Sequence, residues 1–128
     1  MLTREAFNNF CANLPHTHHV VQWGGADVWK VGRAESKKNK LFCVGGWNKD
    51  GDEFAVTFHV SEIGYEMLKD TPGCRPAPYL ASRGMTWIQR FNDEGVSDES
   101  LKDYISRSHE LMRAKLTKTL QRELGFTA

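Results

Sequence analysis

Residues 48–60 are NKDGDEFAVTFHV, and this stretch indicates the class of fold. It joins an Asp-Gly pair, the strongest short-range signal for a hairpin turn, to a strictly alternating segment. From Phe54 to Val60 an apolar side chain occupies every second position, and the positions between them hold Ala55, Thr57 and His59. Because side chains alternate across a strand, the pattern predicts an antiparallel sheet with one buried face and one face available to a partner.

Turn residues divide the middle of the chain into short apolar or β-branched segments, which is the pattern of strands. Five strands are predicted, at residues 18–23, 27–31, 41–47, 53–60 and 85–91. Residues 73–80 hold two prolines, which remove backbone donors and restrict the residues before them. We therefore predict an extended crossover there.

Helical signals occur at both ends of the chain. Near the start, Thr3 can cap an apolar stripe of helical spacing at residues 7–14. Near the end, Ser97 precedes two acidic residues and a broad apolar stripe at residues 101–124, which predicts one long helix.

A short helix is predicted over residues 62–69, with Ser61 as its cap and Ile63, Met67 and Leu68 facing inward. We therefore expect one α+β domain over residues 1–128. Its architecture is predicted to be a five-stranded antiparallel sheet with helices at the N- and C-terminal ends.

Composition excludes several classes of protein. The formal net charge of +1 provides no global field that would attract nucleic acid or an acidic membrane. The three cysteines are odd in number and form no Cys-x-x-Cys pair, which indicates a reducing compartment. Without a signal-peptide pattern or an apolar run of about 18 residues, we expect a cytoplasmic protein with no membrane partner, and a monomer.

Three histidines near the first predicted strand are candidate metal ligands, because neutral imidazole binds transition metals. His16 and His18 would share one face of a strand, beside His19, but no carboxylate or thiolate lies within several residues to complete a site. We therefore predict a solvated start to this strand, with no metal and no cofactor.

No Gly-x-Ser-x-Gly elbow is present to activate a nucleophile. Cys11 and Cys43 fall on predicted inward faces, whereas Cys74 is predicted to be the most exposed thiol. His59 and His109 are isolated in the sequence, which favours structural roles. The sequence therefore predicts no enzymatic activity, and a cryptic enzyme stays the minor alternative.

A dense basic segment precedes the third predicted strand and includes Arg33, Lys37, Lys38 and Lys40. As a loop projecting from a hairpin, it is predicted to be a wing that contacts DNA phosphates, with Arg75 as a further contact. An ordinary solvated loop is the alternative. The second hairpin loop carries more acidic than basic side chains, which argues against a symmetric pair of wings.

The predicted last helix carries a basic edge made by Arg107, Lys115, Lys118 and Arg122. These residues fall within about 80° on a helical wheel. Stabilisation of the helix dipole explains most of this edge without a ligand. Whether the edge and the basic loop form one surface is left open by the sequence.

A second hypothesis is a small-molecule or peptide site on the open face of the sheet. Its predicted residues are His59, Arg75, Tyr79 and Trp87, which combine aromatic surface with basic charge. An exposed apolar patch of this kind usually marks an interaction site in a monomer.

Several segments together resemble the MmcQ/YjbR-like family, in order and over nearly the whole chain. They are residues 10–15 (FCANLP), 22–24 (QWG), 41–44 (LFCV), 73–80 (GCRPAPYL) and 108–116 (SHELMRAKL). The resemblance implies a CyaY-like, or frataxin-like, α-β-α arrangement with both terminal helices on one face of the sheet.

Members of this family carry the label of double-wing DNA-binding protein, so the resemblance implies DNA binding. From the residues themselves we expect this binding to be weak, through phosphate contacts and without catalysis. The iron role of frataxin is not implied, because the first helix offers Glu5 alone among its carboxylates. The family usually has lysine where His59 stands, and this departure weakens phosphate binding on the open face.

Overall fold

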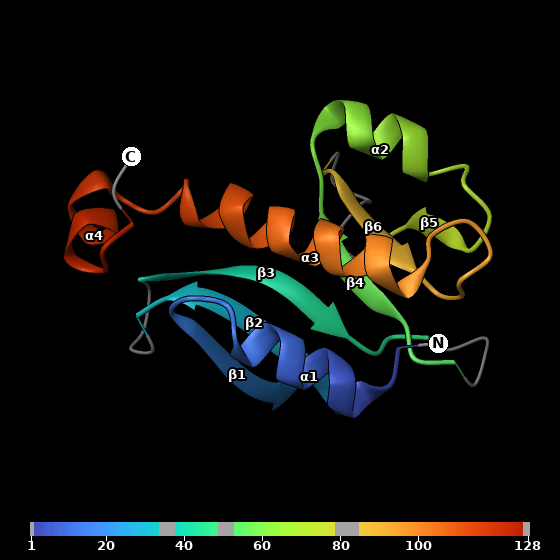
Figure 1. Cartoon of the computed structure of the whole chain (residues 1–128), viewed down its shortest axis with the longest axis horizontal. Helices are drawn as coiled ribbons and strands as arrows, with labels where there is room; N and C mark the ends of the chain where they lie inside the picture. Colours follow the sequence, from blue (N-terminus) through green and yellow to red (C-terminus); the bar gives the residue numbers. More distant parts are fainter. Residues whose placement is uncertain (1, 34–37, 49–52, 79–84, 127–128) are drawn as a thin grey trace.

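The computed structural model describes residues 2–33, 38–48, 53–78 and 85–126, which form four helices and six strands (Figure 1). In chain order the elements are α1 (Arg4–Ala12), β1 (Thr17–Gln22), β2 (Ala26–Gly32), β3 (Asn39–Gly45), β4 (Val56–His59), α2 (Glu62–Leu68), β5 (Cys74–Pro76), β6 (Trp87–Arg90), α3 (Asp98–Arg113) and α4 (Lys118–Glu123). None of these helices has the length and apolar character needed to cross a membrane.

The strands form one antiparallel sheet in the order β1-β2-β3-β4-β6-β5. The sheet has six strands and not the predicted five, because three residues of the predicted crossover pair with β6 as β5. Pro76 is tolerated because β5 is an edge strand, where one side of the backbone needs no ladder partner.

The predicted last helix is two helices. The α3 helix ends at Arg113, and α4 starts after Thr117, whose hydroxyl accepts a hydrogen bond from the Leu120 amide at 3.1 Å. A threonine at this position satisfies a free amide as an N-cap, which favours a new helix over continuation of the old one. The prediction of one helix through residue 124 was therefore wrong at this point.

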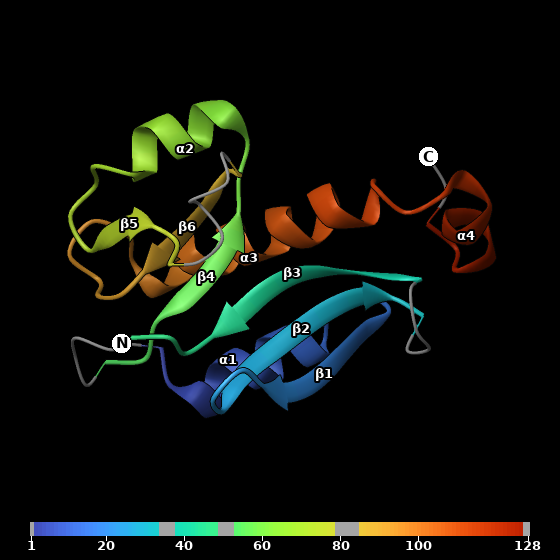
Figure 2. The ribbon, with the colours of Figure 1, turned by 180° about the vertical axis from the view of Figure 1, so that it is seen from behind.

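Both α1 and α3 cover the same face of the sheet, as the views from the two sides show (Figures 1 and 2). Phe7 of α1 and Ile105 of α3 are fully buried in one core cluster with Val56 and Phe58 of β4. The predicted placement of both terminal helices on one face is confirmed.

The opposite face has no helix in front of β1 to β4 (Figure 2), yet its centre is not bare. One row across β2, β3, β4 and β6 consists of Val28, Val44, Thr57 and Gln89, and all four are fully buried. Trp47 packs against the two valines, and the Gln89 side chain donates to the Gly46 and Trp47 carbonyls. The face predicted to be open is therefore partly closed by its own chain.

Strand β3 contains a bulge. Trp29 pairs with Cys43 and Lys30 pairs with Leu41, so Phe42 is an extra residue on β3. The bulge places two consecutive side chains, Phe42 and Cys43, in the core on the helix side, while Leu41 also packs against the cluster on the other face.

A buried serine separates β3 from β4. The two strands pair only at three positions, from Cys43 with Phe58 to Gly45 with Val56. Beyond this point the Ser108 hydroxyl of α3 donates to the Phe42 carbonyl at 2.6 Å and accepts from the His59 amide at 2.9 Å. The hydroxyl thus replaces a ladder hydrogen bond, and Figure 2 shows the strands diverging where α3 crosses behind them.

The start of α3 is fixed by a buried arginine. Arg90 of β6 is fully buried and donates to the Val96 carbonyl at 3.1 and 2.9 Å and to Asp98 at 2.8 Å. Asp98 also accepts from the Leu2 amide at 3.0 Å. Burial would raise the pKa of Asp98, but the Arg90 hydrogen bond and charge outweigh it and hold the pKa below its usual value.

We expect Ser108→Ala to lower the free energy of unfolding by about 1–3 kcal/mol, because it leaves a buried carbonyl and a buried amide without partners. Urea denaturation monitored by tryptophan fluorescence measures the change. The matched control is Ser106→Ala, on the same helix but only half-buried, which should alter stability little. Equal effects of the two substitutions would contradict the bridging role.

Candidate functional site

Three lysines predicted on two separate elements meet at one end of the molecule. Lys40 begins β3, Lys38 precedes it, and Lys115 follows α3. With Thr117 and Thr119 they line a depression of about 220 Å³, which we call the basic end. Figures 1 and 2 both place α4 beside the start of β3. Of the basic edge predicted on the last helix, Lys115 shares this surface with Lys38 and Lys40 of the basic loop, whereas Arg107 lines a different depression.

Arg33 also lies at the basic end, but it is partly neutralised. Its guanidinium donates to the Glu123 carboxylate of α4 at 2.6 Å. This hydrogen bond and the arginine charge lower the pKa of Glu123. Lys37, the fourth member of the predicted basic loop, lies outside the described residues.

Arg75 is far from these lysines in the sheet. It belongs to β5, the edge strand separated from β3 by β4 and β6. Its Nε donates to the Gln89 side chain at 2.8 Å, and its guanidinium lies 4.7 Å from the centre of the Phe91 ring. The five predicted DNA contacts therefore do not form one surface, because Arg75 stands apart.

His59 and Trp87 face each other as partners in the β4–β6 ladder, with ring centres 5.1 Å apart. They line a depression of about 470 Å³, here called the His59 pocket. The other described residues that line it are Val60, Ser61, Glu62, Met85, Thr86, Met112 and Lys115.

The surroundings of the His59 ring disfavour its protonated form. Burial, and then the charge of Lys115, lower the pKa of His59, while the Thr86 backbone has a smaller opposite effect. Its Nδ1 is buried and has no hydrogen-bond partner among the described residues. Of the predicted ligand contacts, His59 and Trp87 are brought together and Arg75 lies apart on β5, while Tyr79 is outside the described residues.

Comparison with known proteins identifies the relatives of this chain. The family model described as YjbR matches residues 12–111, which is most of the sequence. The chain belongs to the YjbR family. The resemblance noted from the sequence is thereby confirmed. Comparison with curated proteins found no match.

Among solved structures, this YjbR-family chain is similar to the crystal structure of Deinococcus radiodurans protein DR2400, which carries the family-model domain DUF419. The TM-score is 0.79 with 22% sequence identity, over 98% of this chain and 89% of that chain. At this identity the similarity shows the shared fold alone.

A third depression of the YjbR-family domain lies between α2 and α3. It measures about 490 Å³ and shares His59, Val60 and Ser61 with the His59 pocket. Ile63 and Met67 of α2 are 75% and 67% exposed beside it, with Leu111 of α3 at 37%. The prediction that Ile63 and Met67 face inward was wrong, because α2 buries only Leu68.

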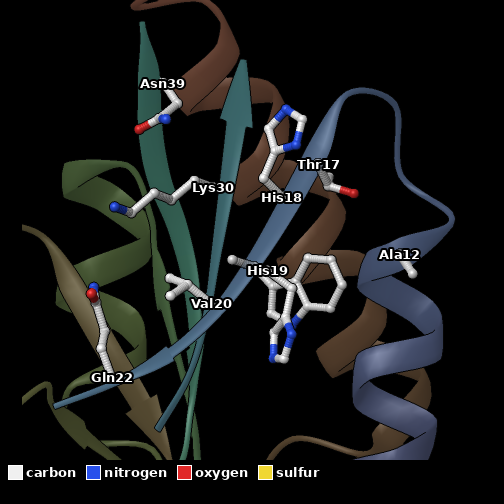
Figure 3. Close-up of a pocket in the computed structure, with 9 residues that line it drawn as sticks. Ala12, Thr17, His18, His19, Val20, Gln22, Lys30 and Asn39 are labelled. Carbon is white, nitrogen blue, oxygen red and sulfur yellow. The ribbon is translucent and has the colours of Figure 1, made fainter. Parts of the chain in front are cut away.

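The histidines near β1 do not converge. His18 contacts the Gly32 carbonyl through Nε2, while Nε2 of His19 lies 2.9 Å from Asp27, which also pairs with Arg4. Both histidines border a depression of about 710 Å³, and Figure 3 shows Val20 and Lys30 on one side of β1 and His19 on the other. The described residues hold no group of three side chains suited to a metal ion.

Cys74 is not the exposed thiol that the sequence predicts. It is only 7% exposed, because β5 joins the sheet and carries it into the core. Cys11 and Cys43 are fully buried, as predicted. Burial raises the pKa of Cys74 to about 11, against a smaller lowering effect of the Arg90 charge.

We expect all three thiols of the folded domain to resist iodoacetamide at pH 8, because at a pKa near 11 about one Cys74 thiol in a thousand is ionised. Mass spectrometry of timed reactions measures the labelling. The same reaction in concentrated urea, where all three thiols are exposed, is the control. Rapid labelling of Cys74 without denaturant would show that the thiol is accessible.

Proposed function

We propose that this YjbR-family domain is a non-enzymatic binding domain that contacts DNA phosphates through the lysines of the basic end. The observation that carries the proposal is the convergence of Lys38, Lys40 and Lys115 on one depression. Among the described residues these three side chains form no salt bridge, and the charge of Lys38 acts on the nearby Glu123 carboxylate.

The remaining surroundings also favour phosphate contacts. Lys118 and Arg122 of α4 are exposed close in sequence to the depression, and Thr117 and Thr119 supply hydroxyl groups beside the lysines. Glu123 is the acidic side chain that lines the depression, and it is engaged by Arg33. Contacts of this kind position a duplex without reading its sequence.

The chemistry of the described side chains supports binding over catalysis. The three thiols are buried, and the His109 ring is held by the Pro15 carbonyl at 2.8 Å. His19 is paired with Asp27, which Arg4 also engages. These groups are used in the fold, which removes them as free nucleophiles or bases.

DNA binding should be weak and steeply dependent on salt. Three phosphate contacts give a slope of about −2.7, so affinity for a labelled duplex should fall roughly 40-fold between about 50 mM and about 200 mM salt. The triple variant K38A/K40A/K115A should lose most of this dependence in fluorescence anisotropy titrations.

The matched control is K69A/R75A/K102A, which removes the same charge away from the basic end, on α2's C-cap, β5 and α3. It should leave affinity within about twofold of the unmodified domain. Equal losses in the two triple variants, or no binding even at about 50 mM salt, would overturn the proposal.

A second candidate function is the binding of an apolar small molecule between α2 and α3. The observation that favours it is the exposure of Ile63 and Met67 beside a depression of about 490 Å³, which is within the size range of ligand sites. Methionine side chains adapt to ligands of different shape, which suits such a site.

The dye 1-anilinonaphthalene-8-sulfonate should bind the folded domain and become fluorescent, and I63A/M67A should abolish most of the signal. The control V20A/V21A removes two exposed apolar side chains from β1 and should leave the signal unchanged. If both double variants lose fluorescence equally, the dye reports general apolar exposure and this candidate fails.

A further inference from the structure

Lys115 borders two depressions at once. It lines the basic end together with Lys38 and Lys40, and it lines the His59 pocket together with Met112 of α3. A phosphate held by Lys115 would therefore lie at the mouth of a pocket of about 470 Å³. In a nucleotide the base is joined to its phosphate through one sugar, so the base belonging to that phosphate lies within reach of the pocket.

The lining of the His59 pocket suits a flat group with polar edges. Met85, Met112 and Trp87 supply apolar and polarisable surface, and Met85 is 40% exposed where it borders the pocket. Thioether sulfur makes favourable contacts with aromatic faces. Trp87 is only 4% exposed, so it contributes a fixed edge and not a mobile ring.

Polar side chains of the pocket can bond to the edge of a nucleobase. The Thr86 hydroxyl donates to the Val60 carbonyl at 2.6 Å and keeps its lone pairs as acceptors, while the Ser61 hydroxyl accepts from the Gly64 amide at 3.1 Å and keeps its proton as a donor. The buried Nδ1 of His59 has no partner among the described residues.

The charge distribution separates phosphate from base. Glu62 is among the residues that line the His59 pocket, and its carboxylate disfavours a second anion there. Lys38, Lys40 and Lys115 concentrate positive charge at the adjoining depression. An anionic group is thus favoured at the basic end, and an uncharged ring is favoured in the pocket.

We infer that the domain prefers single-stranded nucleic acid, with phosphates at Lys38, Lys40 and Lys115 and the adjoining base in the His59 pocket. This inference rests on the proposed phosphate binding and adds the class of nucleic acid. Bases of a duplex are paired and stacked, so entry into a pocket requires unpairing, whereas bases of a single strand are free to enter.

The test compares three labelled probes at one salt concentration: an oligothymidine of about 12 nucleotides, an abasic strand of the same length and charge, and a duplex of that length. We expect the oligothymidine to bind about tenfold more tightly than the abasic strand, because only the former offers bases to the pocket. The duplex should bind more weakly than the oligothymidine.

The variant H59A/M85A should lower affinity for oligothymidine to that for the abasic strand, while K115A should weaken binding of both. Met85→Ala alone is a milder variant at an exposed position and should lose part of the preference even if the double variant is unstable. V20A/V21A on β1 is the control and should retain the full preference.

Equal binding of the oligothymidine and abasic strands, or tighter binding of the duplex, would overturn the base pocket and leave the proposed phosphate binding intact. Absence of binding to all three probes at about 50 mM salt would overturn the proposed function itself and this inference with it.

Discussion

The hydroxyl of Ser108 is the contact on which the arrangement of the domain depends. By bonding to the Phe42 carbonyl and the His59 amide, it ends the pairing of β3 and β4 without leaving either backbone group unsatisfied. The two halves of the sheet then diverge around α3. As a result the end of β4 meets the helix directly, and His59 comes to share a pocket with Met112 and Lys115.

The sequence was sufficient to predict the parts of the fold that local rules control. Thr3, Ser61 and Ser97 are N-caps, as predicted, because capping depends on residues within one turn. The three-residue strand β5 was missed because its pairing with β6 is a tertiary contact that two prolines conceal. The exposure of Ile63 was missed because a helix of seven residues has too few turns to define its buried face.

In the candidate site, too, the sequence predicts which residues are involved but not the tertiary contacts that bring them together. The sequence identifies Lys38, Lys40 and Lys115 as basic residues of two elements, but their meeting depends on where α3 ends and how α4 folds back. Arg75 was grouped with them because neither sequence distance nor charge reveals strand order. The sequence placed His59 and Trp87 in one ligand site, and they are ladder partners, although alternation alone could not show that α3 and Met85 enclose them.

The bulge in β3 determines on which side of the sheet Lys40 of the basic end lies. Because Phe42 is an additional residue, every side chain before it in the strand changes sides relative to those after it. Lys40 pairs with Val31, a residue of the core under the helices, so its ammonium is directed toward α4 and Lys115. Regular pairing through Phe42, without the bulge, would place Leu41 opposite Val31 and Lys40 on the far side of the sheet, which would dismantle the charge cluster without changing the number of lysines.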